Sequence, residues 1–187
     1  MAVTTLDPVT ALIVVDLQKG IVGLPLVHPA ADTVTQSRKL IDAFHDRGLP
    51  VVLVNVTAGA PGRTETPHFD TSSLPADWFE LVPELGAQPD DIRVTKRSWG
   101  AFVNTDLEQQ LKARKVTQVV VTGIATSIGV EATARQAYEL GFNVTLAKDA
   151  MTDLRPEAHE HSLAKIFPRL GETGTVAEIL GLLPAKA

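Results

Sequence analysis

The sequence contains no cysteine among its 187 residues. The chain therefore has no disulfide, no thiol nucleophile and no metal site built on cysteine sulfur. Basic residues are in the minority, since the formal net charge is −5 and the isoelectric point is about 5.5. This balance argues against a nucleic-acid partner, because no basic stripe is available to neutralise phosphates.

Long apolar stretches are missing as well. The longest runs, such as ALIVV and VVLV, are far shorter than the ~20 residues that a membrane-spanning helix needs. The first ten residues, MAVTTLDPVT, lack the basic and apolar regions of a secretory signal peptide. We therefore expect a cytoplasmic protein with no membrane partner, and the chain length suits a single domain over residues 1–187.

What the sequence does contain is an alternation of short apolar runs with helix-like segments. The apolar runs are continuous and rich in β-branched residues, which is typical of strands buried on both faces. The expected strands are 11–16, 51–56, 91–96, 118–123 and 143–149. The expected helices are 30–47, a short piece at 81–85, 105–115, 128–140, 156–167 and 175–183. This order predicts an α/β fold, a three-layer α/β/α arrangement with a doubly wound, mainly parallel sheet.

Two helix starts and one long loop add detail to this outline. Thr105 with Glu108, and Thr175 with Glu178, have the spacing of a capping box, so each pair predicts the first turn of a helix. Residues 57–77 are rich in Gly, Pro, Thr and Ser and are too long for a simple connection. Loops of this length are usually functional or disordered.

Polar residues and glycines stand where the expected strands end. In a doubly wound sheet, ligands bind outside the carboxyl ends of the strands, so these residues are candidates for one crevice. They are Asp16, Asn55, Thr57, Lys96, the segment 123–129 and Asp149. A carboxylate beside an ammonium in a crevice suits acid–base catalysis, which makes Asp16 and Lys96 the leading pair. The alternatives are that Asp16 caps a turn and that Lys96 is an exposed surface lysine.

The turn from Ala125 to Gly129 is the second candidate feature. Backbone N–H groups at a helix start favour a developing negative charge, although a plain turn capped by Thr126 or Ser127 is the alternative. Ser127 has no histidine nearby in the sequence, so a cap is favoured over a nucleophile there. No Walker A or GxGxxG motif is present. His68 with Asp70 is the one metal-like pair, and we expect neither a metal nor a cofactor.

The segments VVDLQKG, VTKRSWGAF and VVVTGIATSIGVEATARQAYELGFNVTLAKDAMTD, in this order, resemble the isochorismatase-like hydrolase superfamily. The resemblance covers roughly Ala11 to Ile179, and its third segment is a specific signature. It implies a parallel sheet flanked by helices. It also implies a hydrolase, because most members are cysteine hydrolases of C–N bonds.

The resemblance assigns catalytic roles to three positions. Asp16 and Lys96 match the Asp and Lys of the family, and Gly129 stands where most members carry the nucleophilic Cys. It also implies a cis peptide bond at Ile124–Ala125. True isochorismatases similarly carry Gly in place of the Cys, and they hydrolyse a vinyl ether by protonating carbon, which requires no covalent nucleophile.

The resemblance and the strand ends together indicate the residues that contact substrate. The candidate set is Ile124, Ala125, Thr126, Ile128, Trp99, Phe102, Thr57 and Arg63. Trp99 and Phe102 would wall the pocket, with core packing as the alternative. This sequence departs from the family at Gly59, which stands near the position of an expected Gln, and Arg63 is the candidate for a substrate carboxylate instead.

These observations favour an enzyme over a binding protein. The predicted activity is hydrolysis of a small, anionic metabolite, with Asp16 as general acid or base, Lys96 as its partner, and amides near Gly129 as an oxyanion or carboxylate site. One alternative is a binding protein that descends from a cysteine amidase and has lost catalysis. Another is an engineered Cys-to-Gly variant of an amidase. The resemblance also implies a homodimer or a larger homo-oligomer.

Overall fold

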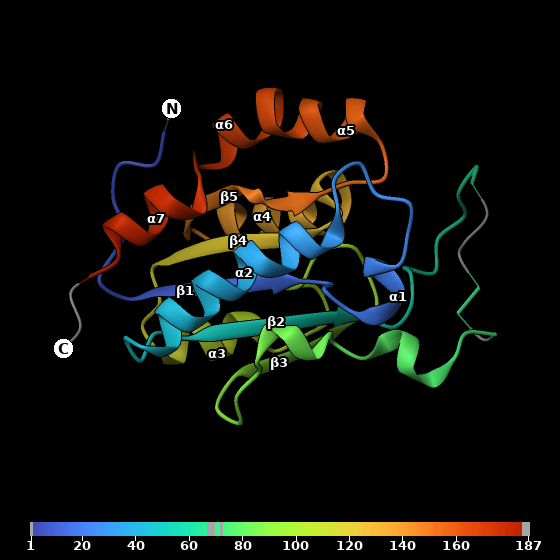
Figure 1. Cartoon of the computed structure of the whole chain (residues 1–187), viewed down its shortest axis with the longest axis horizontal. Coiled ribbons are helices and arrows are strands. Elements are labelled where there is room, and N and C mark those ends of the chain that lie inside the picture. Colours follow the sequence, from blue (N-terminus) through green and yellow to red (C-terminus); the bar gives the residue numbers. More distant parts are fainter. Residues whose placement is uncertain (1, 67–69, 72, 185–187) are drawn as a thin grey trace.

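The computed structural model describes residues 2–66, 70–71 and 73–184. Its centre is a six-stranded sheet in the order β3-β2-β1-β4-β5-β6, in which all neighbouring strands are parallel (Figure 1). The strands are β1 (Thr10–Val15), β2 (Val51–Val56), β3 (Ile92–Lys96), β4 (Gln118–Ile124), β5 (Asn143–Thr152) and β6 (Glu172–Gly174). The predicted α/β class with a doubly wound parallel sheet is confirmed.

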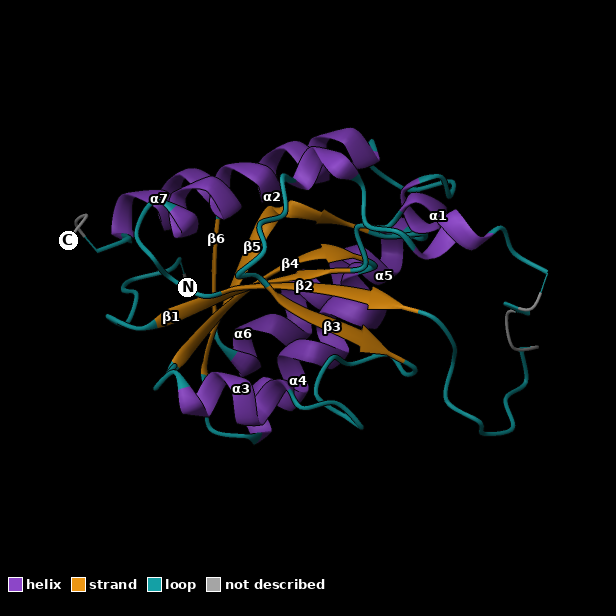
Figure 2. Ribbon diagram, turned by 90° about the horizontal axis from the view of Figure 1, so that it is seen from below, coloured by secondary structure: helices purple, strands orange, loops and turns teal. Residues whose placement is uncertain are grey.

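Helices cover both faces of this sheet (Figure 2). The helices α2 (Ala30–His45) and α7 (Val176–Leu182) lie on one face, and α3 (Leu107–Ala113), α4 (Glu131–Glu139) and α6 (Phe167–Leu170) lie on the other. The shorter helical pieces are α1 (Lys19–Val22), α5 (Pro156–His161), the 3₁₀ turns η1 (Ala76–Phe79) and η2 (Pro83–Leu85), and the π-helical turns η3 (Thr126–Val130) and η4 (Ser162–Ile166). Within the described ranges, no helix is long and apolar enough to cross a membrane.

The two faces of β1 explain why its sequence is apolar without alternation. Ile13 and Val15 point into a core shared with α3, α4 and α6, whereas Leu12 and Val14 point into a second core shared with α2 and α7. Successive side chains of a strand point to opposite faces, so a strand covered on both sides must be apolar at every position. All six residues of β1 are buried.

Two features of the C-terminal half and one helix start differ from the sequence prediction. β5 continues past Asp149 to Thr152, because its pairing with β4 shifts register through a bulge between Val121 and Gly123. The three-residue strand β6 was not expected, since such a short segment carries no recognisable pattern. The capping box at Thr175 and Glu178 is confirmed. The one at Thr105 is wrong, because α3 begins at Leu107 with Asp106 before it and has no side-chain cap.

Candidate active site

The carboxyl ends of β1 and β4 lie side by side in the middle of the sheet. Val15 pairs with Gly123, and the chain then leaves β1 toward α2 on one face and leaves β4 toward α4 on the other. In α/β proteins, the crevice that binds ligands forms at such a divergence above the strand ends. Gly123 has a φ of +121°, and a Cβ there would lie 2.0 Å from the carbonyl oxygen of Val15. Only glycine therefore allows β4 to approach β1 so closely at this point.

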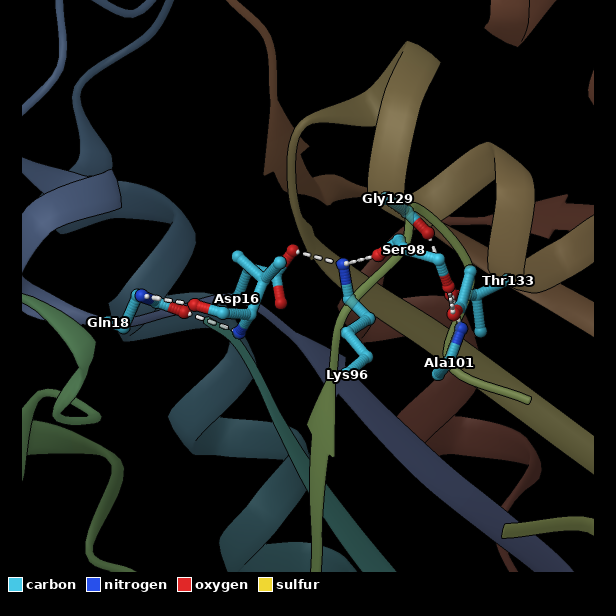
Figure 3. Close-up of polar contacts among 9 residues, drawn as sticks. Asp16, Gln18, Lys96, Ser98, Ala101, Gly129 and Thr133 are labelled. Atoms are coloured by element: carbon cyan, nitrogen blue, oxygen red, sulfur yellow. Dashed lines mark hydrogen bonds and ion pairs between the residues drawn. The ribbon is translucent and has the colours of Figure 1, made fainter. Parts of the chain in front are cut away.

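Asp16 and Lys96 point toward each other at the expected place of this crevice (Figure 3). Lys96 Nζ lies 2.7 Å from Asp16 Oδ2, although β2 separates the two strands that carry them. Asp16 has a φ of +53° while its N–H still donates to the Val54 carbonyl, so the chain turns sharply just after β1 and directs the side chain into the crevice. The Lys96 ammonium also donates to the Ser98 carbonyl at 3.2 Å.

Both side chains of this pair are withdrawn from solvent. The exposed fraction is 5% for Asp16 and 2% for Lys96. Burial raises the pKa of Asp16 to about 6, although the charge and hydrogen bond of Lys96 act in the opposite direction. Among the described residues, Asp16 Oδ1 is buried and has no hydrogen-bond partner. The site therefore contains a carboxyl group that titrates near neutral pH and has one oxygen unengaged.

The turn after β4 places Gly129 directly beside this carboxyl group. The Ile124–Ala125 peptide bond is cis, as the family resemblance implies. A Cβ on Gly129 would lie 3.1 Å from Asp16 Oδ2, 3.0 Å from Val15 Cγ1 and 3.3 Å from the Ile124 carbonyl oxygen. The backbone of Gly129 thus borders the carboxyl group with no side chain between them.

The turn η3 is held by residues from the end of β5, the segment just after it and α5, which the sequence did not single out. Thr126 is buried, and its hydroxyl donates to the Thr152 carbonyl at 3.1 Å and lies 2.8 Å from His159 Nδ1. The Ser127 N–H donates to Asp153 Oδ2 at 2.6 Å. The expected cap by the Thr126 or Ser127 side chain is absent, since η3 has no side-chain cap.

Asp153 replaces Asp149 as the acidic residue at the end of β5. Asp149 is exposed, and its carboxylate accepts the Val176 N–H at 2.7 Å, so it caps α7 instead of facing the crevice. Asp149, one of the candidates at the predicted strand ends, is therefore not placed beside Asp16. The cause is the bulge, which lengthens β5 and moves its carboxyl end three residues further along the chain. A single sequence carries no clear signal for such a bulge.

Gln18 is another buried residue that sequence reasoning missed. Its side-chain amide donates to the carbonyls of Val56 at 3.1 Å and Trp78 at 3.3 Å, and its oxygen accepts the Val56 N–H at 2.8 Å. The Trp78 ring in turn lies against Gly20, where a Cβ would be 2.0 Å from the indole. Gln18 therefore ties the segment after Asp16 to the end of β2 and to η1. Its place two residues after Asp16 in VVDLQKG was the available signal.

The remaining predicted contact residues occupy different environments. Trp99 is 63% exposed on the loop after Lys96, whereas Phe102 is buried in the core, where its ring lies 6.0 Å from that of Phe142. Thr57 is half-buried, and its N–H donates to the Lys96 carbonyl at 3.0 Å. Arg63 is exposed in the long segment after β2, which extends away from the sheet (Figure 1). Thr57 thus adjoins the crevice, and Phe102 follows its core-packing alternative.

Metal ligands do not gather in the part of the chain that the structure describes. No group of three or more His, Asp or Glu side chains is arranged to hold a metal ion within residues 2–66, 70–71 and 73–184. His68, half of the one metal-like pair in the sequence, lies outside those residues. His159 and His161 face different sides of α5, as expected, because His159 is buried and His161 is exposed.

The structure is that of a doubly wound α/β protein with a carboxylate, an ammonium and a backbone turn at the switch point of its sheet. The chain belongs to the isochorismatase family, since the model of the isochorismatase domain matches residues 10–178. Relatives with a named activity include a ureidoacrylate amidohydrolase and an N-carbamoylsarcosine amidase, which are both hydrolases. The chain is therefore a hydrolase of this family.

Individual relatives agree with this assignment. The chain is 43% identical to the uncharacterized isochorismatase family protein YwoC of Bacillus subtilis, over 91% of this chain and 92% of that one. An isochorismatase family protein from Burkholderia thailandensis is similar in structure, with a TM-score of 0.91 and 42% identity over 96% of this chain and 97% of that one. The ureidoacrylate amidohydrolase RutB of Agrobacterium fabrum is 29% identical over 95% of this chain and 91% of its own.

Proposed function

We propose that this hydrolase cleaves a small, anionic metabolite by direct attack of water, without a covalent enzyme intermediate. The observation that carries the proposal is the carboxyl group of Asp16. Its Oδ2 is held 2.7 Å from the Lys96 ammonium, its Oδ1 has no partner among the described residues, and its pKa is raised to about 6. A group that titrates near neutral pH suits both halves of acid–base catalysis.

The two oxygens of Asp16 have different roles in this mechanism. Lys96 donates to Oδ2, so a proton on the carboxyl group resides on Oδ1, the oxygen that is free to face a substrate. With a vinyl ether, the Oδ1 proton moves to the enol-ether carbon and leaves an oxocarbenium ion. Water then adds to this ion and returns a proton to the Asp16 carboxylate. The resulting hemiketal separates into an alcohol and a carbonyl compound.

The backbone at Gly129 supplies the opposite wall of the reaction space. The N–H groups of Ala125 and Gly129 are the candidates for holding an oxyanion or a substrate carboxylate. The Ser127 N–H is not among them, because Asp153 already accepts it. Thr126 and Ile128 shape the turn, and Thr57 adjoins Lys96. In this proposal the exposed side chains of Trp99 and Arg63 are the candidates to offer an incoming substrate a ring face and a cation. Because Gly129 has no side chain, a substrate atom or a water molecule can lie next to Asp16.

A C–N bond is the second substrate class that this site could hydrolyse. The relative RutB is a ureidoacrylate amidohydrolase. For an amide, Asp16 would act in its ionised form as the base that activates water, and the amides of Ala125 and Gly129 would stabilise the tetrahedral oxyanion. An amide is the harder substrate, because its nitrogen must also be protonated before it leaves. We therefore place the vinyl ether first.

The test is an activity panel of vinyl ethers, amides and esters that carry a carboxylate, with wild type and Asp16→Asn compared on each class. We expect turnover of at least one class, reduced by about 10²–10⁴-fold in Asp16→Asn. Asp149→Asn is the matched control. The Asp149 carboxylate accepts the N–H of Val176 at the start of α7, and the side-chain oxygen of Asn can accept the same bond. If no class shows turnover that depends on Asp16, the proposal is wrong, and a binding protein that retains the crevice becomes the better description.

A further inference from the structure

A single hydroxyl, that of Thr133, connects the loop after Lys96 to the turn at Gly129. Thr133 lies on α4 and is fully buried. Its hydroxyl donates to the Gly129 carbonyl at 2.7 Å and accepts the Ala101 N–H at 3.2 Å (Figure 3). A threonine hydroxyl has one proton and two lone pairs, so both bonds form at once and neither competes with the other.

The other end of the same loop holds the catalytic ammonium. Lys96 Nζ donates to the Ser98 carbonyl at 3.2 Å, and the Ser98 hydroxyl donates to the Gly100 carbonyl at 3.2 Å. The segment from Ser98 to Ala101 therefore connects the Lys96 ammonium to the Thr133 hydroxyl, with one hydrogen bond at each of its ends. Lys96 Nζ in turn lies 2.7 Å from Asp16 Oδ2.

We propose that Thr133 is a positioning residue that sets the placement of the Lys96 ammonium relative to both Asp16 and the turn at Gly129. Its consequence for catalysis rests on the proposed function, whereas its effect on the geometry of the ion pair does not. The same loop makes a second hydrogen bond to α4, in which the Phe102 N–H donates to Gln136 at 3.0 Å.

The simpler interpretation of Thr133 is a helical threonine that bonds the carbonyl four residues earlier, which is common inside helices. That interpretation accounts for the bond to Gly129 but not for the bond from Ala101. Ala101 is fully buried, so its N–H needs a partner within the protein, and Thr133 provides it. Valine has the shape of threonine but can neither donate to the Gly129 carbonyl nor accept the Ala101 N–H, whereas the serine hydroxyl can do both.

The experiment compares Thr133→Val with Thr133→Ser, and uses Thr145→Val as the matched control. Thr145 is also fully buried and hydrogen-bonded, to the Gln118 side chain at 3.0 Å, but it lies toward the amino ends of the strands. The readout is the titration of the Asp16 carboxyl carbon by NMR with labelled aspartate, with Asp16→Asn identifying its signal. Because Lys96 lowers the pKa of Asp16, a displaced ammonium raises this pKa.

We expect the titration midpoint of Asp16 to rise by about half a unit to one unit in Thr133→Val, part of the 1–3 units that a neighbouring opposite charge supplies. Thr133→Ser and Thr145→Val should titrate as wild type. A folded Thr133→Val variant with an unchanged midpoint overturns the inference. Should that variant not fold, Thr133→Ala removes the same hydroxyl and decides the question by the same shift.

The titration needs no substrate, so the inference and the proposed function fail separately. A shifted midpoint without any turnover on the panel leaves the positioning role standing and removes the proposed function. Where turnover is found, the transition in the pH profile of kcat/KM should move upward with the Asp16 midpoint in Thr133→Val, whereas Thr145→Val should change only thermal stability. An equal displacement of this transition in Thr145→Val would show that the effect of Thr133→Val is structural and would overturn the catalytic part of the inference.

Discussion

Asp16 and Lys96 form a buried ion pair across three neighbouring strands, with 2.7 Å between Oδ2 and Nζ. The attraction of Lys96 does not keep the pKa of Asp16 at its ordinary value, because burial outweighs this attraction and raises the pKa of the carboxyl group to about 6. Buried pairs of this kind are weak contributors to stability, since removing both charges from water is expensive. The arrangement is better explained by the chemistry of a proton donor or acceptor than by the stability of the fold.

The pH dependence of hydrolysis tells which role Asp16 has. If Asp16 acts as an acid, kcat/KM is constant at low pH and falls as the pH rises through about 6. If it acts as a base, kcat/KM rises through the same pH. We expect the falling profile for a vinyl ether and the rising profile for an amide. A profile without a transition between about pH 5 and 7 would contradict both roles.

The same carboxyl group affects folding stability in a predictable direction. Its pKa in the folded protein, about 6, exceeds the value of 3.8 for an ordinary Asp, so its stabilising contribution is complete below 3.8 and is lost as the pH rises through 6. Relative to Asp16→Asn, wild type should lose about 3 kcal/mol of unfolding free energy between pH 3 and 8. Denaturant unfolding of both proteins at several pH values measures this difference. A constant difference would show that burial does not perturb Asp16.

Lys96→Met removes the charge that lowers the pKa of Asp16 and retains most of the side-chain volume. The pKa of Asp16 should rise further, by about 1–3 units, and the pH limb of kcat/KM should move upward with it. The pH profile of the variant on the best substrate of the panel measures the shift. A limb that stays at the wild-type pH would mean that the titration belongs to another group.

Gly123→Ala tests the close approach of β4 to β1. The added methyl carbon would lie 2.0 Å from the Val15 carbonyl oxygen, at a φ of +121°, so the strand ends must separate. We expect a loss of more than about 3 kcal/mol in unfolding free energy, together with loss of activity as Asp16 is displaced. Gly181→Ala is the control, since nothing lies within 4 Å of its Cβ and alanine favours α7. That variant should be neutral or more stable by up to about 1 kcal/mol.

Gly129→Ala and Gly129→Cys test the reaction space next to Asp16. The added Cβ would lie 3.1 Å from Asp16 Oδ2 and 3.0 Å from Val15 Cγ1, so both neighbours must shift by a few tenths of an ångström. We expect Gly129→Ala to fold and to lose at least about tenfold in kcat/KM, because the methyl group occupies the place of a substrate atom or a water molecule. Gly129→Cys should lose the same activity. A strong amidase activity that appears only with Cys would indicate descent from a cysteine amidase and would count against water attack.

Much of the fold could be predicted from the sequence, because burial on two faces leaves an unmistakable pattern. The run VVLVNV predicts a strand over residues 51–56, which are the bounds of β2, and the capping box at Thr175 locates the start of α7. Errors arose where local patterns compete with pairing between strands. Thr105 has the spacing of a cap, yet its hydroxyl donates to the carbonyls of Ala101 and Phe102 instead.

The candidate site was predictable in its leading residues and not in their supports. Asp16 and Lys96 stand directly at strand ends, so the rule for ligand binding in parallel sheets was sufficient to make both candidates for one site, whereas their direct contact depends on the tertiary structure. Thr133 and His159 lie within helices, where a buried polar residue is indistinguishable from an exposed one until the neighbouring loop is in place. Their partners, Ala101 and Thr126, are more than thirty residues away in the chain.

The sequence by itself determined the parallel α/β architecture, the absence of a thiol and the residues that end the strands, because each of these follows from residue type and periodicity along the chain. Tertiary structure alone decided which of those residues meet. The bulge in β5 removed Asp149 from the crevice and brought Asp153 to the turn, and the reach of Lys96 across β2 completed the ion pair. The physical reason is that register and side-chain reach depend on contacts between distant segments, and no local pattern encodes them.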